Sequence, residues 1–258
     1  MKKFFTLLGL VLAFAVQGLQ AQTLDEIIDT YFENTGGKAQ WEKLQGIKIK
    51  AKINQMGMEI PLDIVQLRSG KQMTVINFQG QQMKQGVFDG KVLWSINMMT
   101  QKAEKSDQET TDNVIREMGD FPDPFLNYKE KGYTAELLGT EEIDGANCFK
   151  IKLTKKPLII EEKEVENVTY YFFDTDNFVP IVVHSEIKSG PMKGQMSEIK
   201  MSDYQEVEGL YFPFSMTQGL KDQEGQVFAI DEIEINPEVA DAEFEFPEDE
   251  ATSEGSNK

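Results

Sequence analysis

Residues 46–55 read GIKIKAKINQ, and this stretch decides the fold class. Apolar residues at positions 47, 49, 51 and 53 alternate with Lys48, Lys50, Lys52 and Asn54. Because successive side chains of a strand point to opposite faces, the alternation predicts a strand with one buried face and one solvated face. Such strands are typical of antiparallel sheets.

The same period continues downstream in short segments separated by turn signals. MEIPLDIVQLR, KQMTVINF, QQMKQGVF and KVLWSIN follow one another at intervals of about ten residues. Asp-Gly pairs at 89–90 and 144–145 are strong hairpin signals. We therefore predict an antiparallel meander that grows to about eleven strands. No break in composition divides the chain, so residues 22–247 are predicted to form one domain.

Helices are expected before the first strand. Thr23 and Glu26 have the spacing of a capping box, apolar residues then recur at helical intervals, and Gly36-Gly37 ends the pattern. A short second helix over residues 38–44 places Trp41 and Leu44 on its inner side. Together the two segments predict a helical cover for one face of the sheet.

One long segment interrupts the strands, from about residue 107 to residue 133. It contains Val114, Ile115 and Met118 on one face of a short helix, followed by FPDPFLNYKEKGY with its two prolines. We interpret it as a lid. The residues therefore predict an α+β fold that is mainly β, with about eleven antiparallel strands, helices at the N-terminus and a lid helix in mid-chain.

Residues 201–216 read MSDYQEVEGLYFPFSM, and strand parity puts Leu210, Phe212, Phe214 and Met216 on one face. A folding core would accept these residues, and so would an apolar ligand. Twelve methionines add soft apolar surface, with the same two readings. Both remain open at this point.

The C-terminal segments carry two further patterns. In residues 226–235 the apolar parity changes, which predicts either a bulge near 229–231 or burial on both faces. In ADAEFEFPEDE we expect Phe244 and Phe246 to point inward. The acidic residues 248–258 are expected to be a disordered tail.

The first residues have the pattern of an export signal. MKKFFTLLGLVLAFAVQGLQAQ has two lysines, an apolar run of about thirteen residues and a small-residue cleavage site, which predicts a signal peptide over 1–21 cleaved near Ala21. The run is shorter than the ~20 residues of a membrane span. We expect an exported and monomeric protein.

Composition excludes several classes of function. A formal net charge of −18 repels phosphate backbones, so we expect no nucleic acid partner. Cys148 and His184 are the only residues of their types, so the usual zinc and thiol-nucleophile templates fail and no metal or cofactor is expected. DTDN at 174–177 lacks the rest of a calcium loop and is typical of a turn. Paired carboxylates among 44 acidic residues leave a hydrolase as a third-ranked alternative.

Several motifs follow one another in a definite order: TGGKAQWEKLQGIK, MGMEIPLDI, VFDGKVLWSIN, DPFLNYKEKGYTAELLGTEEIDGANCFKIKLTKK, YYFFDTDNFVPI and SDYQEVEGLYFPFSM. In this order they resemble the LolA-like periplasmic proteins, and more narrowly the branch common in Bacteroidetes described as outer-membrane lipoprotein-sorting. The resemblance covers essentially the whole mature chain. It implies a half-open barrel around lid helices and a hydrophobic cavity for lipoprotein acyl chains. It also implies transfer between inner- and outer-membrane sorting proteins.

Our leading hypothesis is a carrier, not an enzyme, that shields the acyl chains of a lipoprotein or another lipid. The alternative is a structural or interaction protein whose barrel is fully packed. Candidate ligand-lining residues, chosen by strand parity, are Trp94, Phe172, Leu210, Phe212, Phe214 and Met216.

Overall fold

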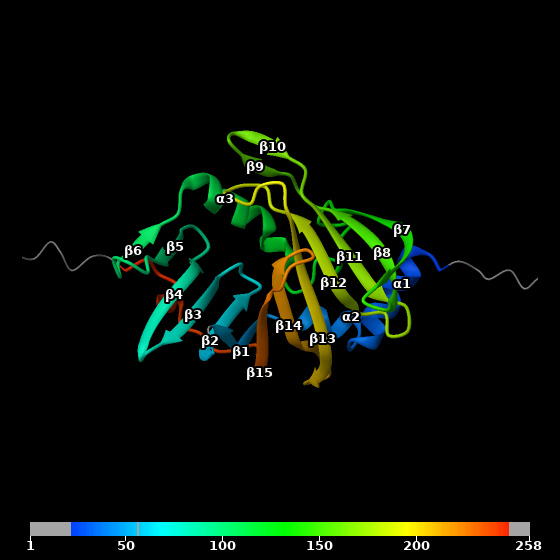
Figure 1. Ribbon diagram of the computed structural model, residues 1–258, viewed down its shortest axis with the longest axis horizontal. Coiled ribbons are helices and arrows are strands. Elements are labelled where there is room, and N and C mark those ends of the chain that lie inside the picture. The colour runs from blue at the N-terminus through cyan, green and yellow to red at the C-terminus, as the bar shows by residue number, and fades with distance from the viewer. Residues whose placement is uncertain (1–21, 56, 248–258) are drawn as a thin grey trace, which may run out of the picture.

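The computed structural model describes residues 22–55 and 57–247 of the chain. The expected signal peptide over 1–21 and the expected acidic tail over 248–258 lie outside these residues. Figure 1 shows a large curved sheet with helices near one of its faces. The helices are α1 (Leu24–Asn34), α2 (Lys38–Lys43) and α3 (Gln108–Glu117), with short 3-10 turns η1 (Met118–Asp120) and η2 (Asp241–Glu243).

Thirteen of the described strands form one antiparallel sheet, in the order β6-β5-β4-β3-β2-β1-β15-β14-β13-β12-β11-β8-β7. Strands β9 and β10 form a separate hairpin. The strands are β1 (Gly46–Gln55), β2 (Met58–Leu67), β3 (Gln72–Phe78), β4 (Gln81–Phe88), β5 (Leu93–Ile96), β6 (Ala103–Lys105), β7 (Thr134–Ile143), β8 (Ala146–Thr154), β9 (Leu158–Ile160), β10 (Lys163–Val165), β11 (Val168–Asp174), β12 (Pro180–Glu186), β13 (Met196–Val207), β14 (Leu210–Leu220) and β15 (Gln226–Ile235).

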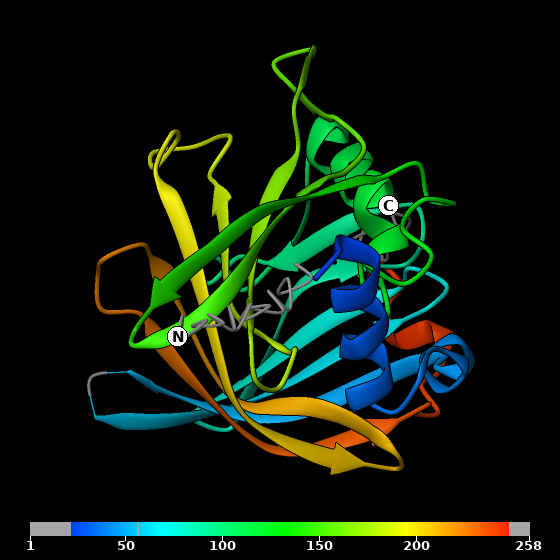
Figure 2. The same cartoon turned by 90° about the vertical axis from the view of Figure 1, so that its right-hand side faces the viewer.

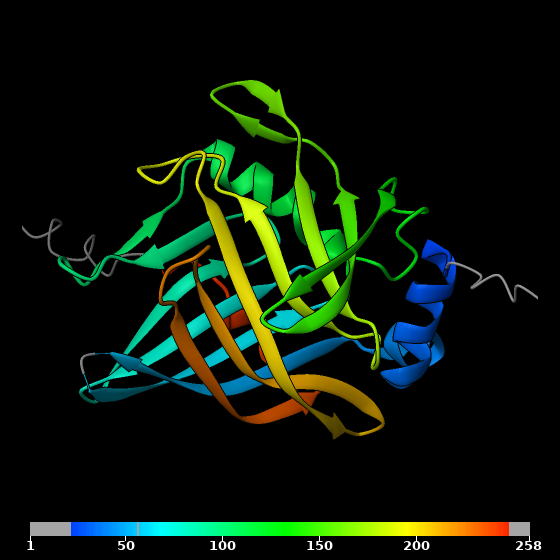
Figure 3. The ribbon, with the colours of Figure 1, turned by 45° about the vertical axis from the view of Figure 1, so that its right-hand side comes forward.

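The sheet is open, since β6 and β7 stand at its two ends and do not pair with each other. In Figure 3 it curls so that these ends stand apart with α3 between them. The pairing of β1 with β15 joins the N-terminal and C-terminal halves of the chain. The half-open antiparallel barrel expected from the sequence is confirmed, with more strands than the expected eleven.

The parity change in β15 comes from a bulge. Lys50 pairs with Glu232 and Ala51 with Ile230, so Asp231 is the extra residue. A bulge lets residues on either side of it keep their apolar side chains on one face. Of the two explanations that the sequence left open, the bulge is the one that the register shows.

Helix α1 forms as the sequence predicts. The Thr23 hydroxyl accepts from the backbone N–H of Glu26, and the Glu26 carboxylate accepts from the backbone N–H of Thr23, so both hydrogen bonds of a capping box are present. Helix α2 is capped at its C-terminal end by Arg68, whose guanidinium donates to the carbonyls of Trp41 and Leu44. These bonds satisfy carbonyls that a helix end leaves unpaired.

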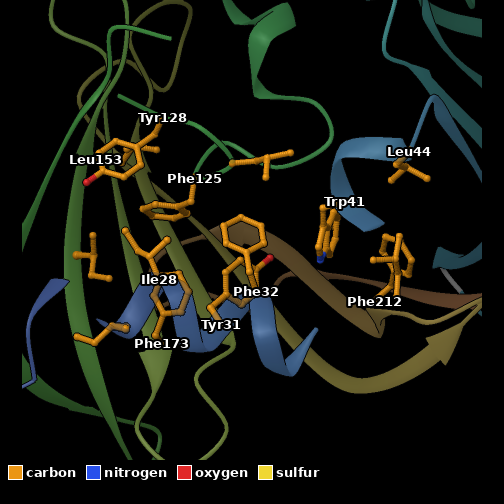
Figure 4. Close-up of a cluster of buried hydrophobic side chains, with 14 of the residues drawn as sticks. Ile28, Tyr31, Phe32, Trp41, Leu44, Phe125, Tyr128, Leu153, Phe173 and Phe212 are labelled. Atoms are coloured by element: carbon orange, nitrogen blue, oxygen red, sulfur yellow. The ribbon is translucent and has the colours of Figure 1, made fainter. Parts of the chain in front are cut away.

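The main core lies between the helices and one face of the sheet, which we call the inner face. In Figure 2, α1 runs across this face. Figure 4 shows the side chains that meet there, including Ile28, Tyr31 and Phe32 of α1, Trp41 of α2 and Phe212 of β14. Phe173 contacts Tyr31, with the ring centroids 5.4 Å apart.

A second core lies on the opposite, outer face of the sheet. Val65, Met73 and Val75 pack there against Trp94 and the C-terminal segment, in which Phe244 is fully buried. The Trp94 indole N–H donates to the Phe244 carbonyl at 2.9 Å. Phe244 is thus buried as expected, but on the outer face of the sheet, and Phe246 is half-buried against the same cluster, so the segment covers the back of the N-terminal strands.

Two local features differ from expectation. The hairpin of β9 and β10 turns at Glu161 and Glu162, both with positive φ, and the sequence predicts no strand there. In α3, Val114 is half-buried and lines two pockets, whereas Ile115 is 44 % exposed. Thus Ile115 does not share a buried face with Val114.

Candidate functional site

The helical cover ends partway along β14. Leu210 and Phe212 are buried, and the Phe212 ring lies 5.3 Å from the Trp41 ring, centroid to centroid (Figure 4). The α1–α2 turn is attached to the start of this strand, because the Tyr211 N–H donates to the Thr35 carbonyl. A side chain at Gly36 would collide with the Gly209 carbonyl, so glycine is required for this close approach. The cover is therefore fixed over the first residues of β14.

Beyond the cover, the same apolar face continues with side chains that are only partly buried. Phe214 and Met216 follow Phe212 on β14, and both are half-buried. Directly paired residues of antiparallel strands point to the same face. The register therefore places four half-buried apolar side chains in one row across four strands: Ile53 of β1, Phe228 of β15, Met216 of β14 and Met201 of β13.

The row extends toward the other end of the sheet. Ile199, two residues from Met201, pairs with Val183 of β12, which pairs with Tyr171 of β11. Tyr171 contacts Phe125 of the lid segment, with the ring centroids 4.8 Å apart, so this is again the inner face. We call the following half-buried residues the inner apolar patch: Ile53, Val183, Ile199, Met201, Phe214, Met216 and Phe228.

The structure separates the six residues predicted to line a ligand site. Leu210, Phe212, Phe214 and Met216 share the inner face, the first two beneath the helical cover and the last two beyond it. Trp94 lies in the outer-face core. Phe172 pairs with Lys150 and Val182 and contacts the His184 ring, opposite to Tyr171 and Phe173.

Five members of the inner apolar patch were not among the predicted site residues: Ile53, Val183, Ile199, Met201 and Phe228. Ile53, Met201 and Phe228 lie on three strands that are far apart in the sequence. Only the strand register brings these residues together. Their alternation with polar residues is visible in the sequence. It identifies the buried parity of each strand but does not say which strands are neighbours.

The cysteine, the histidine and the DTDN segment, which the sequence analysis considered for chemistry, lie away from the patch. Burial raises the pKa of the Cys148 thiol to about 11, which keeps it protonated at neutral pH. His184 is buried, and its Nε2 lies 2.8 Å from the Glu198 carboxylate. Asp174 accepts from the backbone N–H groups of Asp176 and Asn177, so the DTDN segment is a turn.

One pair of carboxylates comes together below α3. The Lys155 ammonium group binds Glu117 at 2.9 Å and Asp120 at 2.6 Å. The same carboxylates accept from Asn167 and from the Tyr133 hydroxyl. These contacts tie the lid segment to the sheet.

Within 22–55 and 57–247, no group of three or more His, Cys, Asp and Glu side chains could hold a metal ion. No helix in the same ranges has the length and the apolar character needed to cross a membrane.

Comparison with known proteins places the fold in a class. A family model described as "-like: Uncharacterized protein" matches residues 125–247. No curated protein matches the sequence. Among solved structures, a LolA superfamily protein from Nitrosomonas europaea aligns with a TM-score of 0.51 at 14 % identity, covering 87 % of this chain and 98 % of its own.

Two further structures are similar. A DUF1329 family protein from Desulfovibrio piger aligns with a TM-score of 0.51 at 14 % identity over 86 % of this chain and 96 % of its own. A domain named for outer membrane lipoprotein sorting, from Vibrio parahaemolyticus, aligns with a TM-score of 0.50 at 10 % identity over 84 % of this chain and 95 % of its own. This chain therefore has the LolA-like fold, as its sequence motifs indicate.

Proposed function

We propose that this protein is a non-catalytic periplasmic carrier that binds the acyl chains of a lipoprotein, or of another lipid, on the inner apolar patch. The observation that carries the proposal is the half-buried row of Ile53, Phe228, Met216 and Met201, which continues the apolar face beyond the helical cover. A face filled by its own core would bury these side chains as it buries Phe212. They therefore have apolar surface left for a ligand.

The energetics favour such a ligand without special polar chemistry. Each methylene group removed from water contributes ~0.8 kcal/mol. The row crosses four strands, which at the usual spacing of neighbouring strands is about 14 Å, enough for much of an acyl chain. Met201 and Met216 are flexible and polarisable, so they can adapt to chains of different shape.

The LolA-like fold supports a place in outer-membrane lipoprotein sorting, since the similar Vibrio domain is named for that process. In this proposal the cargo is delivered and received by membrane proteins of the same sorting process. The expected signal peptide fits a periplasmic location. Residues 22–247 serve as a single binding domain in this proposal.

The decisive experiment measures binding of a fluorescent fatty acid to purified, delipidated protein. We expect saturable binding by the wild-type chain. The double variant Met201→Gln, Met216→Gln should bind at least tenfold more weakly, because each buried amide without a partner costs about 1–3 kcal/mol.

The matched control uses the two neighbouring strand residues. Ser202 and Ser215 pair with each other one residue along the same strands, on the opposite face. Ser202→Gln with Ser215→Gln should leave binding unchanged. Mass spectrometry of lipid extracted from the native protein gives the second readout. Absence of both co-purifying lipid and fatty-acid binding would contradict the proposal and favour the alternative, a fully packed interaction protein.

A further inference from the structure

The inner face changes from apolar to polar along β11, β12 and β13. Thr169 pairs with Ser185, and Ser185 pairs with Ser197. The Ser185 and Ser197 hydroxyl oxygens lie 2.8 Å apart. Each hydroxyl residue lies two positions from an apolar one, so this polar row lies about 7 Å from the row of Tyr171, Val183 and Ile199 on the same face.

A pocket of about 400 Å³ opens at this polar row. Helix α3, the β9 strand and the strands β11 and β12 surround it, and both Thr169 and Ser185 contribute to its wall. Thr169 is only 7 % exposed as a residue, but its hydroxyl oxygen is accessible and hydrogen-bonds none of the residues that the structure describes. The pocket therefore contains an unpaired hydroxyl group that is available to a ligand.

The charges around the pocket restrict what it can accept. Its lysines are already paired: Lys155 binds Glu117 and Asp120, and Lys188 binds Glu186 at 2.8 Å. The Glu109 carboxylate also lines the wall. Because carboxylates outnumber cations, a phosphate or carboxylate ligand would meet net repulsion. Hydroxyl and amide groups, by contrast, can bind an uncharged polar group.

We propose that this α3 pocket binds the uncharged, hydroxyl-bearing headgroup of the lipid whose chain lies on the inner apolar patch. This inference rests on the proposed function, since the chain and the headgroup belong to one ligand. A glycerol ester has the required chemistry: hydroxyl groups that can bond Thr169 and Ser185, an ester without net charge, and an acyl chain that continues over Val183 and Ile199.

The experiment compares three ligands with one acyl chain: monolauroylglycerol, methyl laurate and ionised laurate. Their affinities are measured at pH 8 by displacement of the uncharged dye Nile red from delipidated protein. We expect monolauroylglycerol to bind about fivefold more tightly than methyl laurate for each hydrogen bond gained. Laurate should bind most weakly of the three.

The variant Thr169→Val with Ser185→Ala tests the pocket directly. It should reduce the preference for monolauroylglycerol over methyl laurate to near unity and leave the affinity for methyl laurate unchanged. The control Ser202→Ala with Thr217→Val removes two hydroxyl groups outside the pocket and should keep the preference. Urea unfolding of each variant shows whether the fold is retained.

Each result has one interpretation. Tightest binding of laurate, or a preference that survives Thr169→Val with Ser185→Ala, would overturn the headgroup pocket while leaving acyl-chain binding intact. Equal binding of all three ligands by the wild-type protein would do the same. Failure of every ligand, and of the fluorescent fatty acid, would overturn the proposed function itself and the pocket with it.

Discussion

The rings of Trp41 and Phe212 meet with their centroids 5.3 Å apart and their planes inclined at 59°. This contact marks the limit of the helical cover on β14, because Phe214, two residues further on the same face, is only half-buried. One strand thus serves two purposes. Its first residues hold the helices to the sheet, and its later residues leave an apolar surface available for a ligand.

The first prediction separates these purposes by truncating each ring. Phe212→Ala should lower the free energy of unfolding by about 3–5 kcal/mol, as truncation of a buried phenylalanine usually does. Phe214→Ala should cost less than half of that, because its ring is already partly in water. Urea unfolding measures both. Only Phe214→Ala is expected to weaken fatty-acid binding in a folded protein, and equal destabilisation by the two variants would contradict this division.

Local patterns in the sequence predict much of the fold because their causes are local. The capping box of Thr23 and Glu26 is a three-residue spacing, and the bulge at Asp231 appears as a change of parity. The β9–β10 hairpin is missed for an equally local reason. Its turn residues Glu161 and Glu162 have positive φ, where asparagine and glycine are the usual signals.

The candidate site is harder to predict because it depends on which strands are neighbours and on which face the helices cover. Phe172 and Phe173 are both almost completely buried, on opposite faces of β11, so that strand has no alternation to indicate its inner side. Trp94 is buried by a segment 150 residues away in sequence. Parity within β14, in contrast, groups Leu210 with Phe214 and Met216 correctly on one face.

The second prediction concerns Trp94, which the structure places on the outer face. Trp94→Phe should leave fatty-acid binding unchanged, because the ring packs against Phe246 and the backbone of Phe244. It should destabilise the protein by about 1 kcal/mol or more, since the Phe244 carbonyl loses its buried hydrogen-bond donor. Fluorescence titration and urea unfolding give the two numbers. A marked loss of binding by a folded Trp94→Phe protein would return this residue to the ligand site.

The third prediction concerns the helical cover. Thr23→Ala removes the hydroxyl that accepts from the Glu26 N–H and should lower the free energy of unfolding by about 1 kcal/mol. Thr23→Ser keeps the hydroxyl and is the matched control. Hydrogen exchange of the first turn of α1 should be faster in the alanine variant alone. Identical exchange in both variants would show that the cap does not hold the start of the cover.

The fourth prediction uses the buried carboxyl group beneath α1. Burial raises the pKa of Asp123, although hydrogen bonds from the Tyr31 hydroxyl and the Phe125 N–H oppose this effect. A raised pKa means that the folded protein binds the proton more tightly than the unfolded chain. The stability that this proton contributes is fully present below the ordinary pKa of about 3.9, and it is lost as the pH rises through the folded value.

Asp123→Asn removes this titration while keeping the size of the side chain. The free energy of unfolding of the variant, relative to the wild type, should therefore rise between pH 4 and pH 7. Asp107→Asn is the control of opposite sign, because the hydrogen bond from Thr110 lowers the pKa of Asp107, and the wild type loses that contribution as the pH falls. Urea midpoints at several pH values measure both differences. If the Asp123→Asn curve ran parallel to the wild type over this range, the fold would not raise the pKa of Asp123.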